Sequence, residues 1–160
     1  MASKLEALRD AVTEHLSGRA RIGRAGVTVL SRKVANLQAQ IEEQLGRLGI
    51  CAVVLVPGAD GNARQSIQGY LDPVRVVVRC VEDTLLNRTG IGAMELAEEV
   101  YAALVHWQPP VAGAALLSPE KNAIRELNLI GKLEEEADED LFGFDVNLTS
   151  KIALPPRTDP

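Results

Sequence analysis

Residues 74–82, Val-Arg-Val-Val-Val-Arg-Cys-Val-Glu, are the stretch that decides the fold. Successive side chains of a β-strand point to opposite faces of the sheet, so the even-numbered positions from Val74 to Cys80 form one apolar face. The odd-numbered positions from Arg75 to Val81 alternate arginine with valine. This pattern predicts a strand with one buried face and one mixed face.

A second apolar stretch, residues 50–56, lies earlier in the chain and has no polar face. A run that is apolar on both alternating sets is typical of a strand covered on both sides, so we expect it to be the central strand of the sheet. Residues 57–62 (Pro-Gly-Ala-Asp-Gly-Asn) are turn formers and predict the end of that strand. The strand of residues 74–82 then begins near Pro73, where proline is tolerated.

Two amphipathic helices are predicted before these strands, because apolar residues recur there every three or four positions. The first covers residues 3–16 and ends at Gly18. The second covers residues 31–48, with Ser31 as its N-terminal cap and Gly49 in a left-handed conformation behind it.

A third helix is predicted over residues 91–107, after a glycine-containing turn, and Pro109-Pro110 ends it. We expect one stripe of this helix to contain Met94, Ala97, Tyr101 and Leu104, with Leu96, Val100 and Ala103 beside it. Residues 111–121, which are rich in glycine and alanine, are predicted to form a linker.

The C-terminal part of the chain carries the clearest alternation, with Phe142, Phe144, Val146, Leu148 and Ile152 on one side. A weaker alternation covers residues 127–133, and the acidic run at residues 134–140 lies between the two. The simplest arrangement is a long antiparallel hairpin. Its second strand turns Phe142, Phe144, Val146 and Leu148 toward the core, since a slip of one residue would expose the whole apolar set.

Together these elements predict an α+β fold: a mixed or antiparallel sheet of about four main strands with a long C-terminal hairpin, packed by two to three helices. We expect one domain over residues 1–153, which buries roughly 70% of its unfolded surface, and a proline-rich tail at residues 154–160. No signal-peptide core and no run of about 18 apolar residues occurs, so a soluble protein without membrane contact is expected.

The composition argues against two kinds of nucleic-acid binding. Only 3% of the residues are aromatic, which disfavours a base-stacking platform. The formal net charge of −5 disfavours a protein that binds duplex DNA over a whole face, because phosphate neutralisation needs clustered lysine and arginine. A local basic patch is compatible with both observations.

No catalytic or metal-binding constellation is visible in the sequence. His15 and His106 stand alone, without Cys, Asp or Glu at ligand spacing. The turn at residues 89–95 has two glycines but lacks the third glycine of a dinucleotide-binding loop. Cys51 and Cys80 lie in predicted strands and are expected to be buried thiols. We therefore expect a protein that is not an enzyme and holds neither metal nor cofactor.

Two charged segments are candidate contact surfaces. Residues 18–26 combine three glycines with three arginines, which predicts a flexible basic loop that either meets phosphate or an acidic neighbour or stays exposed without a partner. Residues 134–140 read as a solvated hairpin tip and lack the ligand pattern of a calcium loop. The candidate interface with other subunits or partners consists of Arg19, Arg21, Arg24, Arg75, Arg79, Glu134, Glu135, Glu136, Asp138, Glu139 and Asp140.

Taken in order, these elements resemble the tail terminator, or tail completion, proteins of long-tailed bacteriophages. The resemblance rests on the apolar spacing of residues 50–56, 74–82, 94–104 and 144–152. It implies a non-enzymatic virion protein that forms a ring, usually of six subunits. Such a ring caps the tail tube protein at full tail length and joins the tail to the head-neck connector protein, with DNA passing at most transiently through its lumen.

The resemblance further implies a location in the tail or neck of the virion, and in the host cytoplasm during assembly. Two alternatives stay open. One is another phage or contractile-injection component, such as a head-closure, tube or baseplate protein. The other is a small cytosolic ligand-binding or regulatory α+β module, which would require a pocket with convergent polar groups.

Overall fold

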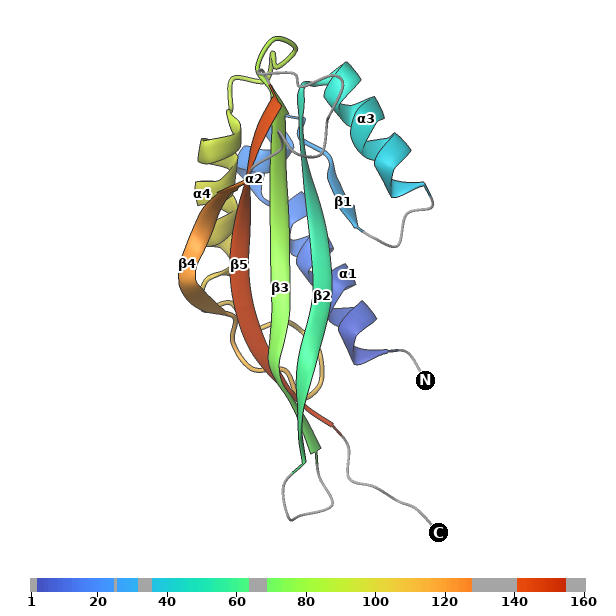
Figure 1. Cartoon of the computed structure of the whole chain (residues 1–160), viewed down its shortest axis with the longest axis vertical. Helices are drawn as coiled ribbons and strands as arrows, with labels where there is room; N and C mark the ends of the chain where they lie inside the picture. The colour runs from blue at the N-terminus through green and yellow to red at the C-terminus, as the bar shows by residue number, and fades with distance from the viewer. Residues whose placement is uncertain (1–2, 25, 32–35, 64–68, 128–140, 155–160) are drawn as a thin grey trace.

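The computed structural model describes residues 3–24, 26–31, 36–63, 69–127 and 141–154, which form a five-stranded sheet with helices beside it (Figure 1). In chain order the elements are α1 (Lys4–Ser17), α2 (Ala20–Arg24), β1 (Val29–Ser31), α3 (Leu37–Arg47), β2 (Ile50–Ala63), β3 (Gly69–Asp83), α4 (Ala93–Leu104), β4 (Ser118–Leu127) and β5 (Leu141–Ala153). The strand order is β1-β2-β3-β5-β4, parallel between β1 and β2 and antiparallel elsewhere. The predicted α+β class with a mixed sheet is confirmed.

β3 lies at the centre of the sheet and has the two faces that its sequence predicts. The apolar face, formed by Val74, Val76, Val78 and Cys80, has no exposed surface. On the other face Arg75 is exposed, and Val77 and Arg79 are half-buried. The strand begins at Gly69 rather than near Pro73, because a shift of register around the proline accommodates it inside the strand.

β2 is buried on both faces over residues 50–54, as predicted, but it is not the central strand. The three-residue strand β1, which the sequence analysis did not identify, pairs with the other edge of β2. The predicted turn at residues 57–62 is wrong, because β2 continues to Ala63 in antiparallel pairing with β3. Two shifts of register within residues 55–61 mark bulges, and these allow proline and glycine in the strand.

β4 and β5 form the predicted antiparallel C-terminal hairpin, and β5 also pairs with β3. Val146 and Leu148 have no exposed surface, Phe144 is 9% exposed and Phe142 is half-buried, so the predicted buried face of β5 is confirmed.

The partner strand β4 lies earlier in the chain than predicted. It covers Ser118–Leu127 instead of residues 127–133, of which only Leu127 is among the described residues. The predicted linker at residues 111–121 is therefore wrong from Ser118 onward. A shift of register between Pro119 and Ile124 interrupts the alternation of side chains, which explains why the sequence shows no clear strand pattern here.

α1 matches its prediction closely. Ser3 caps it through a hydrogen bond from the Glu6 backbone N–H to the Ser3 hydroxyl oxygen (3.3 Å), and Leu8, Val12 and Leu16 are fully buried. The predicted flexible loop at residues 18–26 is wrong, because residues 20–24 form the short helix α2.

α3 begins later than predicted, at Leu37. The expected cap, Ser31, is instead the last residue of β1, which joins the sheet in place of capping a helix. Gly49 has the predicted left-handed conformation, with φ of +81°. A β-carbon there would lie 2.3 Å from the Asn87 nitrogen, so this position requires glycine for space as well as for conformation.

α4 spans Ala93–Leu104, inside the predicted range, but its buried stripe differs from the expected one. Met94 is 56% exposed and Tyr101 is half-buried. The residues that face the core are Ala93, Leu96, Ala97, Val100, Ala103 and Leu104. Leu96, Val100 and Ala103, predicted beside the stripe, thus face the core in place of Met94 and Tyr101. The three alanines of the set let the helix approach the sheet closely.

The two faces of the sheet are covered unequally. α1 and α4 pack on one face, here called the inner face, with β-strand residues such as Ala52, Val76 and Val146 in one large apolar cluster. On the opposite, outer face, α3 packs over a small cluster formed by Leu30, Cys51 and Val53. No described element packs on the outer face of β5 and β4. Figure 1 looks onto this face, with α1 and α2 behind the strands.

Candidate functional site

The uncovered outer face of β3, β5 and β4 is centred on an ion pair between Arg79 and Asp145. These residues stand opposite each other on β3 and β5. The Arg79 Nε lies 2.9 Å from one carboxylate oxygen and Nη2 lies 3.1 Å from the other, so the contact is bidentate. Hydrogen bonding to Asp145 raises the pKa of Arg79 above its ordinary value. The pair lies in the middle of the face and occupies the Nε and one Nη donor of Arg79.

Three further cations share this face with Arg79. Arg75 is exposed and lies four residues away on β3, and Arg125 stands opposite Asp145 on β4. The Lys151 ammonium lies 4.3 Å from the centre of the Tyr70 ring, a cation–π contact. We call Arg75, Arg79, Arg125 and Lys151 the basic face. With Asp145 its formal charge is +3 (four cations and one carboxylate), although the chain as a whole carries −5.

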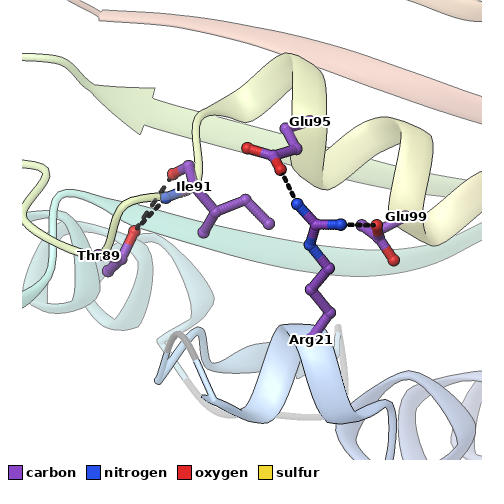
Figure 2. A network of polar contacts seen from close by, with 5 residues as sticks. All are labelled: Arg21, Thr89, Ile91, Glu95 and Glu99. Carbon is purple, nitrogen blue, oxygen red and sulfur yellow. Dashed lines mark hydrogen bonds and ion pairs between the residues drawn. The ribbon is translucent and has the colours of Figure 1, made fainter.

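The structure separates the predicted basic residues. Arg21 extends from α2 toward α4, where its guanidinium pairs with Glu95 and, at 3.3 Å, with Glu99 (Figure 2). α2 lies on the helix side of the sheet, so Arg21 is not on the face that carries Arg75 and Arg79. All three side chains of the Arg21 network are partly or largely exposed, so each pair contributes only about 0–1 kcal/mol to stability.

Of the other predicted interface residues, Arg19 is exposed beside α2, and the backbone of Arg24 ends that helix. The acidic residues Glu134, Glu135, Glu136, Asp138, Glu139 and Asp140 lie outside the described residues. The sequence analysis did not single out Arg125 or Lys151, because their position on the same face depends on the pairing of β4 with β5 and of β5 with β3.

The turn before α4 is held by a buried carboxylate that the sequence analysis did not interpret. Glu82 is 7% exposed, and its carboxylate accepts hydrogen bonds from the Ala93 backbone N–H (2.8 Å) and from the Asn87 amide (2.6 Å). The Thr89 hydroxyl donates to the Asn87 side-chain oxygen and contacts the Ile91 carbonyl oxygen. Figure 2 shows the contact between Thr89 and Ile91. The N-terminus of α4 is therefore occupied by a side chain of the protein itself, consistent with a structural turn instead of a phosphate-binding loop.

This rigid turn presents apolar side chains to solvent. Leu85 is 63% exposed and Leu86 is 45% exposed. Both belong to the loop between β3 and α4, which lies at the opposite end of the molecule from the last residues of β2 and the first residues of β3 (Figure 1). Met94, 56% exposed, follows in the first turn of α4. Three large apolar side chains are therefore exposed at and just after this turn.

The histidine and cysteine side chains have structural surroundings. His15 stacks on Trp107, with ring centres 4.0 Å apart, and its Nε2 lies 3.0 Å from the Ala103 carbonyl oxygen. Cys51 and Cys80 are buried free thiols, as predicted. Burial raises the pKa of Cys51 to about 12 and also raises that of Cys80, so neither thiol is activated as a nucleophile.

One surface hollow and the possible metal ligands of the described residues bear on whether the protein has a small-molecule site. A shallow hollow of about 460 Å³ is lined by one loop, residues 108–114, whose side chains are apolar apart from Gln108. Within the described part of the chain no group of three or more His, Cys, Asp or Glu could hold a metal ion. Among the described helices, none has the length and apolar character needed to cross a membrane.

The comparison with known proteins finds similarity in structure but not in sequence families. No family model matches the sequence, and no curated protein matches it. Among solved structures, the chain is similar to a chain of the "Virion of native gene transfer agent (GTA) particle". The TM-score is 0.56 with 18% sequence identity, over 96% of this chain and 100% of that chain. At this identity the likeness concerns the fold, and it extends over nearly all of both chains.

Proposed function

We propose that this protein is a non-enzymatic structural protein of a phage-like virion, and more specifically a tail terminator. The observation that carries the proposal is the fold likeness to a chain of a gene transfer agent virion, which covers nearly the whole of both chains. The order of elements, which independently resembles tail terminators, supports the finer assignment. In this role the protomers form a ring, usually of six, that caps the tail tube and joins it to the head-neck connector.

The distribution of surfaces in the protomer supports an assembly role. One end of the long axis carries the exposed loop with Leu85 and Leu86, and the outer side of the sheet carries the basic face. A ring subunit needs one surface for each axial partner and two different surfaces for its neighbours, because contacts in a cyclic ring of more than two subunits are heterologous. Its location follows as the tail or neck of the virion, after assembly in the host cytoplasm.

Charge steers the encounter of neighbouring copies in this proposal. Before the copies touch, the basic residues Arg19, Arg21, Arg24, Arg75 and Arg79 of one copy attract the acidic run Glu134–Asp140 of another. Such attraction mainly raises the rate of association and weakens with salt. DNA, if it meets the ring, passes transiently through the lumen.

The test reverses part of the acidic run. We expect E134K/E135K to lower the rate and extent of ring formation at low salt, measured by sedimentation velocity and by electron microscopy of the protein mixed with tail tubes. The matched control is E42K/E43K, an equal charge change at two exposed positions of α3. A wild type that stays monomeric in the presence of tail tubes contradicts the ring, whereas an unaffected E134K/E135K ring contradicts only the steering role.

The likeness to a virion chain also favours a second candidate, another phage or contractile-injection component such as a head-closure, tube or baseplate protein. Electron microscopy of the same mixture separates the two. A terminator binds at one end of a finished tube, whereas a tube protein is incorporated along its length.

A further inference from the structure

We propose that neighbouring copies dock by placing the outward side of α1 from one copy on the basic face of the next. This inference rests on the proposed ring and identifies the two surfaces that meet. It begins with α1, whose buried side is formed by Leu8, Val12 and Leu16. On a helix, positions near 180° from that stripe point away from the core.

The outward side of α1 is acidic. Glu6, Asp10 and Glu14 follow each other at four-residue spacing on the side opposite Leu8, Val12 and Leu16, and Glu6 and Glu14 are exposed. Arg9, which is mostly buried, has its Nε 3.5 Å from the Asp10 carboxylate. We call Glu6, Asp10 and Glu14 the acidic stripe; its formal charge is −3, or −2 with Arg9 included.

The acidic stripe and the basic face lie on opposite sides of one protomer. α1 packs on the inner face of the sheet, so its outward side points away from the sheet, whereas the basic face points outward on the other side. Two complementary surfaces that face in opposite directions produce head-to-tail association, because each copy keeps one of them free for the next. This is the heterologous contact that a ring requires.

The two surfaces also match in length. Glu6 and Glu14 are about 12 Å apart along a helix, eight residues at the helical rise. Arg75 and Arg79 are about 13 Å apart along a strand, four residues at the strand rise. Val77, which is half-buried, lies between Arg75 and Arg79 on the same face of β3, so an apolar side chain stands between two of the charges.

The test uses two charge-reversed variants. E6K/E14K makes the stripe basic, and R75E/R125E makes the face acidic while leaving the Arg79–Asp145 pair intact. Each variant alone should associate at least about tenfold more weakly than wild type in sedimentation velocity at low salt, because like charges then meet at the contact. An equimolar mixture should recover association, since the two variants can alternate.

Pairwise binding of one fluorescent variant to the other is measured at the same time, and it reports docking whether or not a closed ring forms. E42K/E43K on α3 is the control and should associate as wild type does. Circular dichroism checks folding. If a double variant does not fold, the single substitution E14K or R125E takes its place. Normal association of R75E/R125E overturns the proposal. So does full ring assembly when E134K/E135K replaces E6K/E14K in the mixture, because the acidic stripe would then meet a reversed face. A mixture of E6K/E14K and R75E/R125E that fails to bind while wild type assembles also overturns it.

Discussion

At the scale of single residues, Glu82 shows how one carboxylate stabilises both a turn and a helix. Its oxygens accept hydrogen bonds from the Ala93 backbone and the Asn87 side chain, and the helix N-terminus favours its negative charge. We expect Glu82→Ala to lower the free energy of unfolding by about 1–3 kcal/mol, since two donors lose their partner in a buried site. Urea unfolding measures the change, with the exposed Glu98→Ala as control. If Glu82→Ala lowers the free energy of unfolding no more than Glu98→Ala does, water replaces the carboxylate as hydrogen-bond partner.

At the scale of elements, much of the fold could be predicted because periodicity reports burial directly. β3 and β5 alternate cleanly, and α1 has both a cap and a regular stripe, so each lies close to its predicted place. β4 and the distal half of β2 were missed, because bulges break the alternation on which the prediction depends. The close approach of Gly49 to Asn87 joins residues that are distant in sequence and meet only after folding.

The candidate site was predictable to a similar extent. Arg75 and Arg79 were identified because they interrupt an apolar strand, and their shared face follows from the period of a strand. Asp145 lies on the polar side of the alternation in β5, but its pairing with Arg79 requires the register between two strands far apart in the chain. The position of Arg125 on this face depends on a further strand pairing, that of β4 with β5. Surfaces assembled across strands are thus less visible in the sequence than the strands themselves.

The pair between β3 and β5 gives the prediction for this scale. A double-mutant cycle of Arg79→Ala and Asp145→Ala should show a coupling free energy of about 1 kcal/mol in the free energy of unfolding, because the bidentate contact is partly shielded from water. Arg79 is one-third exposed, so solvent screening keeps the value modest. The matched cycle of Arg75→Ala with Thr149→Ala, a pair of opposite residues further along the same face, should give no coupling above error. Equal values in both cycles would contradict a specific Arg79–Asp145 contribution.

At the scale of the whole molecule, the unequal layers predict an order of opening. Cys51 belongs to the small outer cluster under α3, whereas Cys80 belongs to the large inner cluster under α1 and α4. Few apolar contacts hold α3, so we expect it to detach without global unfolding and to expose Cys51 first. The variants C51S and C80S each retain one thiol, which allows the two labelling rates to be measured separately with a thiol reagent.

The C80S protein, which retains Cys51, should label faster than the C51S protein in the absence of denaturant. Because burial raises the pKa of Cys51 to about 12, almost no thiolate exists in the closed state at neutral pH, so labelling requires opening. The rate should rise with pH up to the ordinary pKa of an exposed thiol, since the open form then reacts mainly as thiolate. Equal rates for both variants, each tracking global stability in urea, would show that the two layers open together, and that α3 is as firmly attached as the inner helices.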